Sequence, residues 1–291
     1  MLMFSAPVLM QVLINGLSLS AIYVLIALGF TLLFGIMKVV NFAHGSFAML
    51  GGYALFYYFG ELKLPYVVAI VLAALTVASL SLVLEWLVYR RFYQKMFQSM
   101  IGLLGLDIAI VYTSVLVWDV YERSVPAALD TMVQLGPVMI PADKLMVIGI
   151  AIAVLLAFWA FMSSSRYGLA VRASAEDIEI AEAQGVNTRR IYQLAFFLAV
   201  FMTAIAGAIY AQTYALSPFM GERPLMVAFI VVILGGMGSI PGAALGGVIF
   251  GFAESFLATF YGSATSTFVS FAVVIALLVI RPWGLLGKPE H

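Results

Sequence analysis

Long runs of apolar residues, separated by short polar segments, follow one another along the whole chain of 291 residues. A run of about 20 residues is long enough for an α-helix to cross a hydrocarbon core of roughly 30 Å. The alternating strands of about ten residues that mark a membrane β-barrel do not appear. We therefore predict an all-α, polytopic integral membrane protein with about eight to ten transmembrane helices. The runs cover residues 8–36, 42–59, 65–89, 100–121, 143–163, 191–214, 225–237, 242–261 and 265–280.

The composition supports a membrane protein and argues against disulfides, metal sites and nucleic-acid binding. Hydrophobic residues make up 64% of the chain and charged residues 10%, whereas a soluble domain is about half apolar and about a quarter charged. With no cysteine and two histidines, we expect no disulfide and no metal site. The formal net charge of zero gives no electrostatic case for nucleic acid. The start of the chain lacks a basic region and a small-residue cleavage site, so we expect no removable signal peptide.

Clusters of basic residues predict the orientation of the chain. Such clusters mark cytoplasmic loops in membrane proteins. This rule places the N-terminus outside, in the periplasm, and the C-terminus in the cytoplasm. The cytoplasmic clusters are Arg90, Arg91 and Lys95, then Arg166, Arg172, Arg189 and Arg190, and finally Arg281 and Lys288.

Two glycine-rich polar breaks interrupt apolar runs, one in each half of the chain. They read VVNFAHGSFAMLGG (39–52) and GGMGSIPGAALGG (235–247). Paired breaks of this kind predict discontinuous or re-entrant helices beside a transport pathway, so we expect 41–46 and 235–242 to lie close together. The alternative is that the glycines only let helices pack closely. The pathway candidates are Asn41, His44, Gly45, Ser46, Gly235, Gly236, Gly238, Ser239, Pro241 and Gly242.

Two of the polar residues within these runs have open roles. His44 either lines the pathway or is a core histidine whose ring nitrogens are satisfied by hydrogen bonds. Asp107 lies inside the predicted span 100–121, and an ionisable residue there is a functional candidate by default. The alternative for Asp107 is a position near an aqueous vestibule or a bond to a neighbouring helix.

One long polar segment, residues 164–190, interrupts the apolar pattern on the predicted cytoplasmic side. Ser174 and Asp177 have the spacing of a capping box, and Gly185 is placed to end the helix that follows. Asn187 or Thr188 then caps the next helix. The resulting helix of about ten residues is too short to be stable alone. It either packs on its own membrane domain or couples to an ATPase through Glu176, Asp177, Ile178, Ala181, Glu182 and Gly185.

Several of these segments together resemble a known family. They are VNFAHG (40–45), LEWLVYR (84–90), AEDIEIAEAQGVN (175–187), ILGGMGSIPGA (233–243) and RPWGLLG (281–287). Their sequences and order are similar to LivH-type permeases, the inner-membrane subunits of branched-chain amino acid ABC importers. Asp107 departs from the small or hydroxyl residue that the resemblance leads us to expect at its position.

The resemblance implies one transmembrane permease domain over 1–291, multi-pass in a bacterial inner membrane and surrounded by lipid. It also implies a second, related permease in a heterodimer, two cytoplasmic ATPases that bind ATP and magnesium, and a periplasmic substrate-binding protein. This chain itself holds no cofactor. The expected substrate is a branched-chain or other hydrophobic amino acid. Importers of urea or short-chain amides use similar permeases, so these small molecules are the alternative.

Two other classes of function compete with an ATP-driven permease. An ion-coupled secondary transporter would use intramembrane acids, for which Asp107, Asp119, Glu85 and Glu254 are available. A membrane enzyme would need a nucleophile paired with a base, and neither G-x-S-x-G nor H-E-x-x-H occurs. The phosphate-loop motif is also missing. We therefore expect a chain that is not an enzyme and that depends on partners for ATP hydrolysis.

Overall fold

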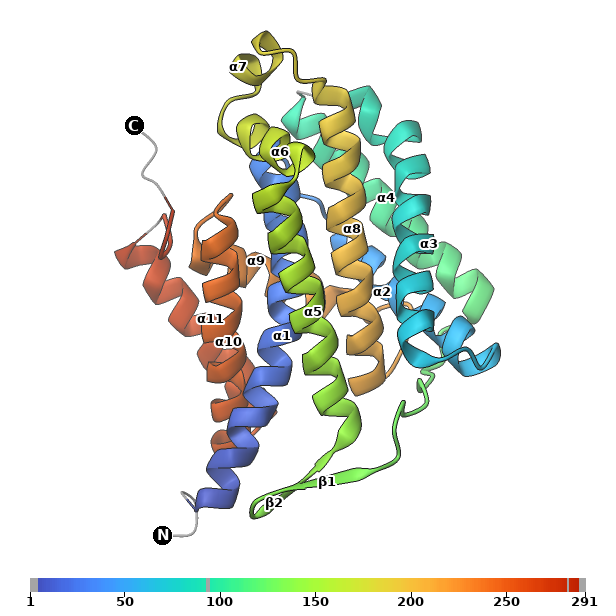
Figure 1. Cartoon of the computed structure of the whole chain (residues 1–291), viewed down its shortest axis with the longest axis vertical. Helices are drawn as coiled ribbons and strands as arrows, with labels where there is room; N and C mark the ends of the chain where they lie inside the picture. The colour runs from blue at the N-terminus through green and yellow to red at the C-terminus, as the bar shows by residue number, and fades with distance from the viewer. Residues whose placement is uncertain (1–4, 93–94, 282, 288–291) are drawn as a thin grey trace.

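The computed structural model describes residues 5–92, 95–281 and 283–287 as a bundle of helices (Figure 1). Six of these helices are long and apolar enough to cross a membrane. They are α1 (Ala6–Met37), α3 (Tyr66–Leu87), α4 (Met96–Trp118), α5 (Ala142–Ser164), α8 (Thr188–Thr213) and α10 (Ile240–Tyr261). The remaining apolar helices are α2 (His44–Leu55), α9 (Glu222–Gly235) and α11 (Ser263–Ile280). Each predicted apolar run overlaps one of these helices, which confirms the prediction of an all-α polytopic membrane protein. Six of the described helices are long and apolar enough to span a membrane, fewer than the eight to ten transmembrane helices predicted.

Short elements join the long helices. A π-helical turn, η2 (Phe56–Glu61), extends α2, and a 3₁₀ turn, η3 (Tyr89–Phe92), follows α3. The loop after α4 contains a small antiparallel hairpin that the sequence did not predict, made of β1 (Met132–Leu135) and β2 (Val138–Pro141). It lies beside the first turns of α1, at the opposite end of the bundle from α6 (Arg166–Glu176) and α7 (Ile178–Ala183) (Figure 1).

Helices α1 and α8 form the centre of the bundle. Helix α1 packs against α10, α8 and α9, and α8 packs against α2 and α3. Small residues allow the backbones to touch: a side chain on Gly207 would overlap the backbone of Ala48, and one on Gly51 would overlap that of Ala204. Close approach at small residues is the usual way in which helices associate in membranes. The α2–α8 contact therefore fixes the position of α2.

The polar segment 164–190 forms two helices instead of the single helix that we predicted from Ser174. Helix α6 begins at the cap of Ser165, whose Oγ accepts a hydrogen bond from the Gly168 amide at 2.8 Å, so Ser174 lies inside α6 and is buried. Asp177 is the cap of α7 and accepts from the Glu179 and Ile180 amides. Gly185 ends this helical segment with a φ of +85°. Asn187, one of the two residues predicted to cap the next helix, is the cap of α8.

Candidate functional site

Helix α2 begins inside the bundle and not at its surface. Its first residue, His44, places Nε2 3.0 Å from the carbonyl oxygen of Ile26. Ile26 lies 11 residues before the end of α1 at Met37, which is about 16 Å along the helix axis. This is about half the thickness of a hydrocarbon core. The chain therefore turns back into the membrane after α1 and starts α2 near the middle of the membrane.

Helix α9 begins at the same depth and meets the start of α2. The backbones of Gly45 and Gly221 touch, and a side chain on either glycine would overlap the other residue. Helix α9 has 14 residues, about 21 Å in length, so it does not cross the membrane. Each of these half-helices presents the positive end of its dipole at the junction. Discontinuous helices with facing ends of this kind form transport sites in other membrane proteins.

The second predicted break lies elsewhere and has another role. Residues 235–242 connect the far end of α9 to α10, and Gly235 packs against Gly242. The amides of Leu285 and Leu286 donate to the carbonyls of Leu234 and Gly235. Gly45 contacts Gly221, and the nearest neighbours of Gly235, Gly236, Gly238 and Gly242 include no residue of 41–46, so the predicted contact between the two breaks is not seen at these glycines.

The other pathway candidates in this second break serve as connectors. Ser239 caps α10 by accepting a hydrogen bond from the Gly242 amide at 3.1 Å, and Pro241 occupies the first turn of α10. Gly236 packs on Gly287, and Gly238 faces Gly35. A glycine is required at 236 and 238 because both have a positive φ, of +107° and +80°. These residues anchor the C-terminal segment to the end of α9.

His44 is a buried brace between three helices. Its Nε2 lies 3.1 Å from Thr203 Oγ1 of α8 in addition to the carbonyl of Ile26 in α1. Because a carbonyl only accepts hydrogen bonds, Nε2 carries a proton. The imidazole ring is nearly perpendicular to the Phe30 ring, with 5.4 Å between the two ring centroids, and the residue has no exposed surface. His44 is thus buried in the core, but the core role predicted from the sequence has both ring nitrogens bonded, and Nδ1 has no partner among the described residues.

Replacing His44 by alanine should therefore destabilise the bundle. The change leaves a cavity and removes the donor to the Ile26 carbonyl, which together cost about 2 to 4 kcal/mol. We expect a lower unfolding temperature of the purified permease. Thr203→Val is the matched control, because it keeps the bond between His44 and Ile26 and should cost less. A His44→Ala variant with unchanged stability and impaired transport would instead place His44 on the pathway.

Next to the junction lies a cavity of about 200 Å³, which we call the Asp107 cavity. Ser46 donates a hydrogen bond to Asp107 Oδ1, so α2 and α4 are linked at this point. Asp107 is half-buried and Glu222 is exposed. Gly45 and Phe219 also line the cavity. The structure thus brings the candidates Gly45, Ser46 and Asp107 together. The Asn41 side chain is buried, and its amide group has no hydrogen-bond partner in the part of the chain that the structure describes.

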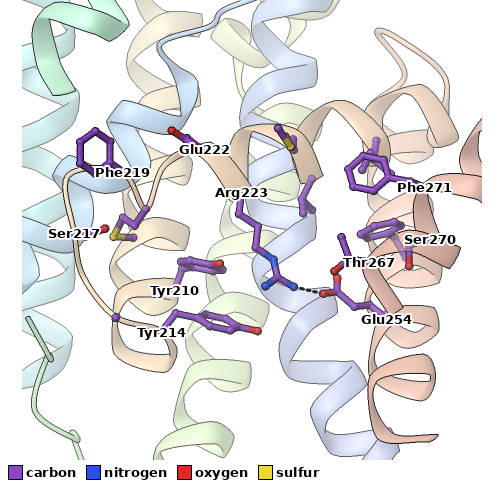
Figure 2. A pocket seen from close by; sticks show the side chains of 16 residues that line it. Tyr210, Tyr214, Ser217, Phe219, Glu222, Arg223, Glu254, Thr267, Ser270 and Phe271 are labelled. Atoms are coloured by element: carbon purple, nitrogen blue, oxygen red, sulfur yellow. Dashed lines mark hydrogen bonds and ion pairs between the residues drawn. The ribbon is translucent and has the colours of Figure 1, made fainter. Parts of the chain in front are cut away.

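On the other side of the α9 start lies a larger cavity of about 390 Å³, the Arg223 cavity (Figure 2). Arg223 of α9 forms an ion pair with Glu254 of α10. Glu254 also accepts a hydrogen bond of 2.6 Å from the Tyr23 hydroxyl of α1. The Arg223 guanidinium lies over the ring of Tyr214, 5.6 Å from its centroid. The two cavities share Phe219 and Glu222, so they are neighbours across the start of α9.

Sequence reasoning did not select Arg223 and used Glu254 only as a possible ion-coupling residue. The sequence signal for this pair was Glu254 itself, an acid inside the apolar run 242–261 that requires a partner at membrane depth. The basic residue that meets it lies 31 positions earlier, in the short segment between the predicted runs 191–214 and 225–237. Only the half-helix α9 brings the two together.

The predicted coupling residues differ in accessibility. Glu176, Asp177, Glu182 and Gly185 are exposed, and Ile178 is half-buried. Ala181 is 3% exposed, because it faces its own chain, so its expected place on a contact surface is wrong. Ile180, which was not selected, is 63% exposed. Glu182 accepts a hydrogen bond from Thr188 Oγ1 at 2.6 Å, which links α7 to α8.

A bundle of membrane-spanning helices, with two half-helices meeting between charged cavities, defines a membrane permease. A family model described as "Branched-chain amino acid transport system / permease component" matches residues 12–278. The chain belongs to this family, which confirms the resemblance seen in its motifs.

Individual relatives agree with the family assignment. The chain is 32% identical to the high-affinity branched-chain amino acid transport system permease protein BraD of Pseudomonas aeruginosa, covering 97% of this chain and 96% of that protein. It is equally similar, at 32% with the same coverage, to LivH of Escherichia coli K12. A probable LivH of Methanocaldococcus jannaschii is 28% identical over 92% of this chain and 89% of its own length. The similarity therefore spans nearly the whole permease.

Proposed function

We propose that this chain translocates branched-chain or other hydrophobic amino acids across a bacterial inner membrane as one permease of an ABC importer. The observation that carries the proposal is the junction of α2 and α9, where Gly45 touches Gly221 between two cavities at membrane depth. A half-helix that starts in the membrane leaves polar backbone there, and such backbone is stable only against protein or water. The relatives named for branched-chain amino acid transport support this substrate class.

The charged residues at the junction indicate which face meets the second permease. Glu222 is exposed and the Arg223 side chain is 42% exposed. A charged group at this depth is strongly disfavoured against lipid and faces protein or a water-filled path. The face around the start of α9 therefore lies against a second, related permease, and the pathway runs between the two chains. We expect this pairing to be a heterodimer.

The end of the bundle that carries α6 and α7 is the one that meets the ATPases. Basic residues at this end, Arg166, Arg172, Arg189 and Arg190, favour a cytoplasmic location. Helix α7 has six residues and presents Ile180 to the surroundings, so it is suited to bind in a groove of another protein. Two ATPases, which bind ATP and magnesium, would dock here, and a periplasmic binding protein would deliver substrate at the opposite end.

Two alternatives have less support from the structure. An ion-coupled transporter needs an acid that can release its ion, but Glu254 is held by both Arg223 and Tyr23. Asp107, another of the acids available for this role, is bonded to Ser46. A permease for urea or short-chain amides needs mainly polar walls. Apolar side chains of Met226, Ile230 and Phe271 contribute to the Arg223 cavity.

Uptake by the reconstituted complex tests the proposed function. We expect proteoliposomes containing both permeases, both ATPases and the binding protein to accumulate leucine with ATP and to lose this uptake when the ATPases are omitted. Urea and propionamide should not be taken up. Leucine uptake by the permeases alone, driven by a proton or sodium gradient, would overturn the ATP-driven mechanism. Uptake of urea in place of leucine would overturn the substrate class.

A further inference from the structure

We propose that Arg223 binds the carboxylate of the transported solute in the Arg223 cavity, as a weak resting site within the membrane. The site would select a solute that carries a free carboxylate beside an apolar side chain, over amides and urea. This inference rests on the proposed function and deepens it, because it assigns the recognition chemistry to one residue of the pathway.

The ion pair with Glu254 uses only part of the binding capacity of Arg223. A guanidinium has five N–H donors, and Nη2 donates to Glu254 Oε1. No other hydrogen bond from the Arg223 side chain is present among the described residues. Glu254, in contrast, is 8% exposed and has both oxygens engaged, by Arg223 and by Tyr23. Within this ion pair the accessible charge is therefore the cation, and the exposed carboxylate of Glu222 lines the same cavity at the start of α9.

The surroundings hold Arg223 ready for a planar anionic ligand. The ring of Tyr214 supports one face of the guanidinium, and Glu254 fixes one of its edges (Figure 2). A carboxylate matches the fork of N–H groups that an arginine presents, with two parallel hydrogen bonds. Because the side chain is already oriented, a ligand would not have to order it.

A buried hydroxyl of α11 belongs to the wall of the cavity. Ser270 of α11 lines the cavity and is 5% exposed, yet its Oγ has no hydrogen-bond partner in the described part of the chain. A buried hydroxyl without a partner is costly. The side chains of Ser270 and Thr267 lie on the α11 side of the cavity, beyond Glu254 in the view of Figure 2.

The size and walls of the cavity suit an aliphatic amino acid. Its volume of about 390 Å³ lies within the usual range for small-molecule sites. Side chains of Met226, Val227, Ile230, Phe250 and Phe271 form apolar walls. Glu222 points to the other side of the α9 start from Arg223 (Figure 2), where its exposed carboxylate offers a partner for an ammonium group on the route between the two cavities.

The depth of Arg223 argues against a lipid phosphate as the ligand. Arg223 is the second residue of the 14-residue helix α9, so it lies about 18 Å from the other end of this helix. Its neighbour Gly221 contacts Gly45 near the middle of the membrane. Lipid phosphates lie beyond the hydrocarbon core, about 15 Å or more from the midplane. A solute within the pathway reaches this position directly.

The test compares two variants that separate the guanidinium from the ion pair. Glu254→Gln keeps Arg223 charged, and the amide oxygen that replaces the carboxylate still accepts a hydrogen bond from Tyr23. The double variant Arg223→Gln with Glu254→Gln removes the guanidinium without leaving an unpaired buried charge. The unfolding temperature of the complex of permeases and ATPases, without binding protein, is measured against leucine, isovalerate, leucinamide and inorganic phosphate.

We expect leucine and isovalerate to stabilise the wild type and Glu254→Gln, with little effect of leucinamide or phosphate. In the double variant the half-saturating leucine concentration should rise about ten- to a hundred-fold, as for the loss of a charge-assisted pair of hydrogen bonds. Equal stabilisation by leucinamide, equal stabilisation by phosphate, or unchanged leucine binding in the double variant would each overturn the assignment. These binding results do not depend on transport, so failure of ATP-driven leucine uptake would overturn the proposed function separately.

Discussion

Replacing Gly45 by valine will prevent the chain from forming a stable permease. Gly45 and Gly221 touch through their backbones where the two half-helices meet, and even a Cβ atom on Gly45 would overlap the carbonyl of Gly221 and crowd Leu225. Neither neighbour is the free end of a flexible side chain, so α2 and α9 would have to separate. Overpacking against backbone costs about 3 kcal/mol or more. We expect little folded protein in detergent extracts and transport at background level.

The matched control for this variant is Gly105→Val. Gly105 lies in α4, and a side chain there would meet nothing within 4 Å. Valine has a higher helix propensity than glycine, so this change should leave folding intact. Size-exclusion profiles and thermal unfolding of both purified variants measure the difference. A Gly45→Val protein as stable as Gly105→Val would show that the junction of α2 and α9 is not tightly packed.

Replacing Gly185 by valine should disconnect ATP hydrolysis from transport while the membrane helices stay folded. Gly185 has a φ of +85° and open space around it, so the cost of valine is backbone strain of about 1 to 3 kcal/mol and not a collision. The amide of Gly185 donates to the carbonyl of Glu182, and the amide of Val186 donates to the carbonyl of Ala181. Relief of the strain would reorient α7. We expect leucine uptake per ATP hydrolysed to fall about ten-fold or more.

Gly136→Val is the control for the backbone strain that valine causes at a positive φ. Gly136 also has a positive φ, of +58°, and open space around it, but it lies in the hairpin at the opposite end of the bundle. The two variants should lose similar stability, and only Gly185→Val should bind the ATPases weakly in a pull-down. If both variants, or neither, lose coupling, α7 is not the segment that contacts the ATPases.

The sequence alone determined the class of the protein and the positions of its membrane helices. The length and apolar character of a run such as 143–163 are local properties, and they match α5 (Ala142–Ser164) closely. The cap at Asn187 and the stop at Gly185 are also local, because each depends on a few neighbouring backbone groups. The family motifs lie within single short segments as well. Such features do not require knowledge of which helices are neighbours.

The tertiary structure decided which segments meet. Glycine-rich breaks look alike in sequence, so nothing local showed that Gly45 contacts Gly221 and that Gly235 instead packs on Gly242. Ser174 and Asp177 are both plausible caps, and Asp177 caps α7 because α6 continues through Ser174. The pair of Arg223 and Glu254 forms only because α9 starts at half the membrane depth. The contacts of Gly45 with Gly221 and of Arg223 with Glu254 join residues far apart in the chain, and their free energy depends on how whole helices pack.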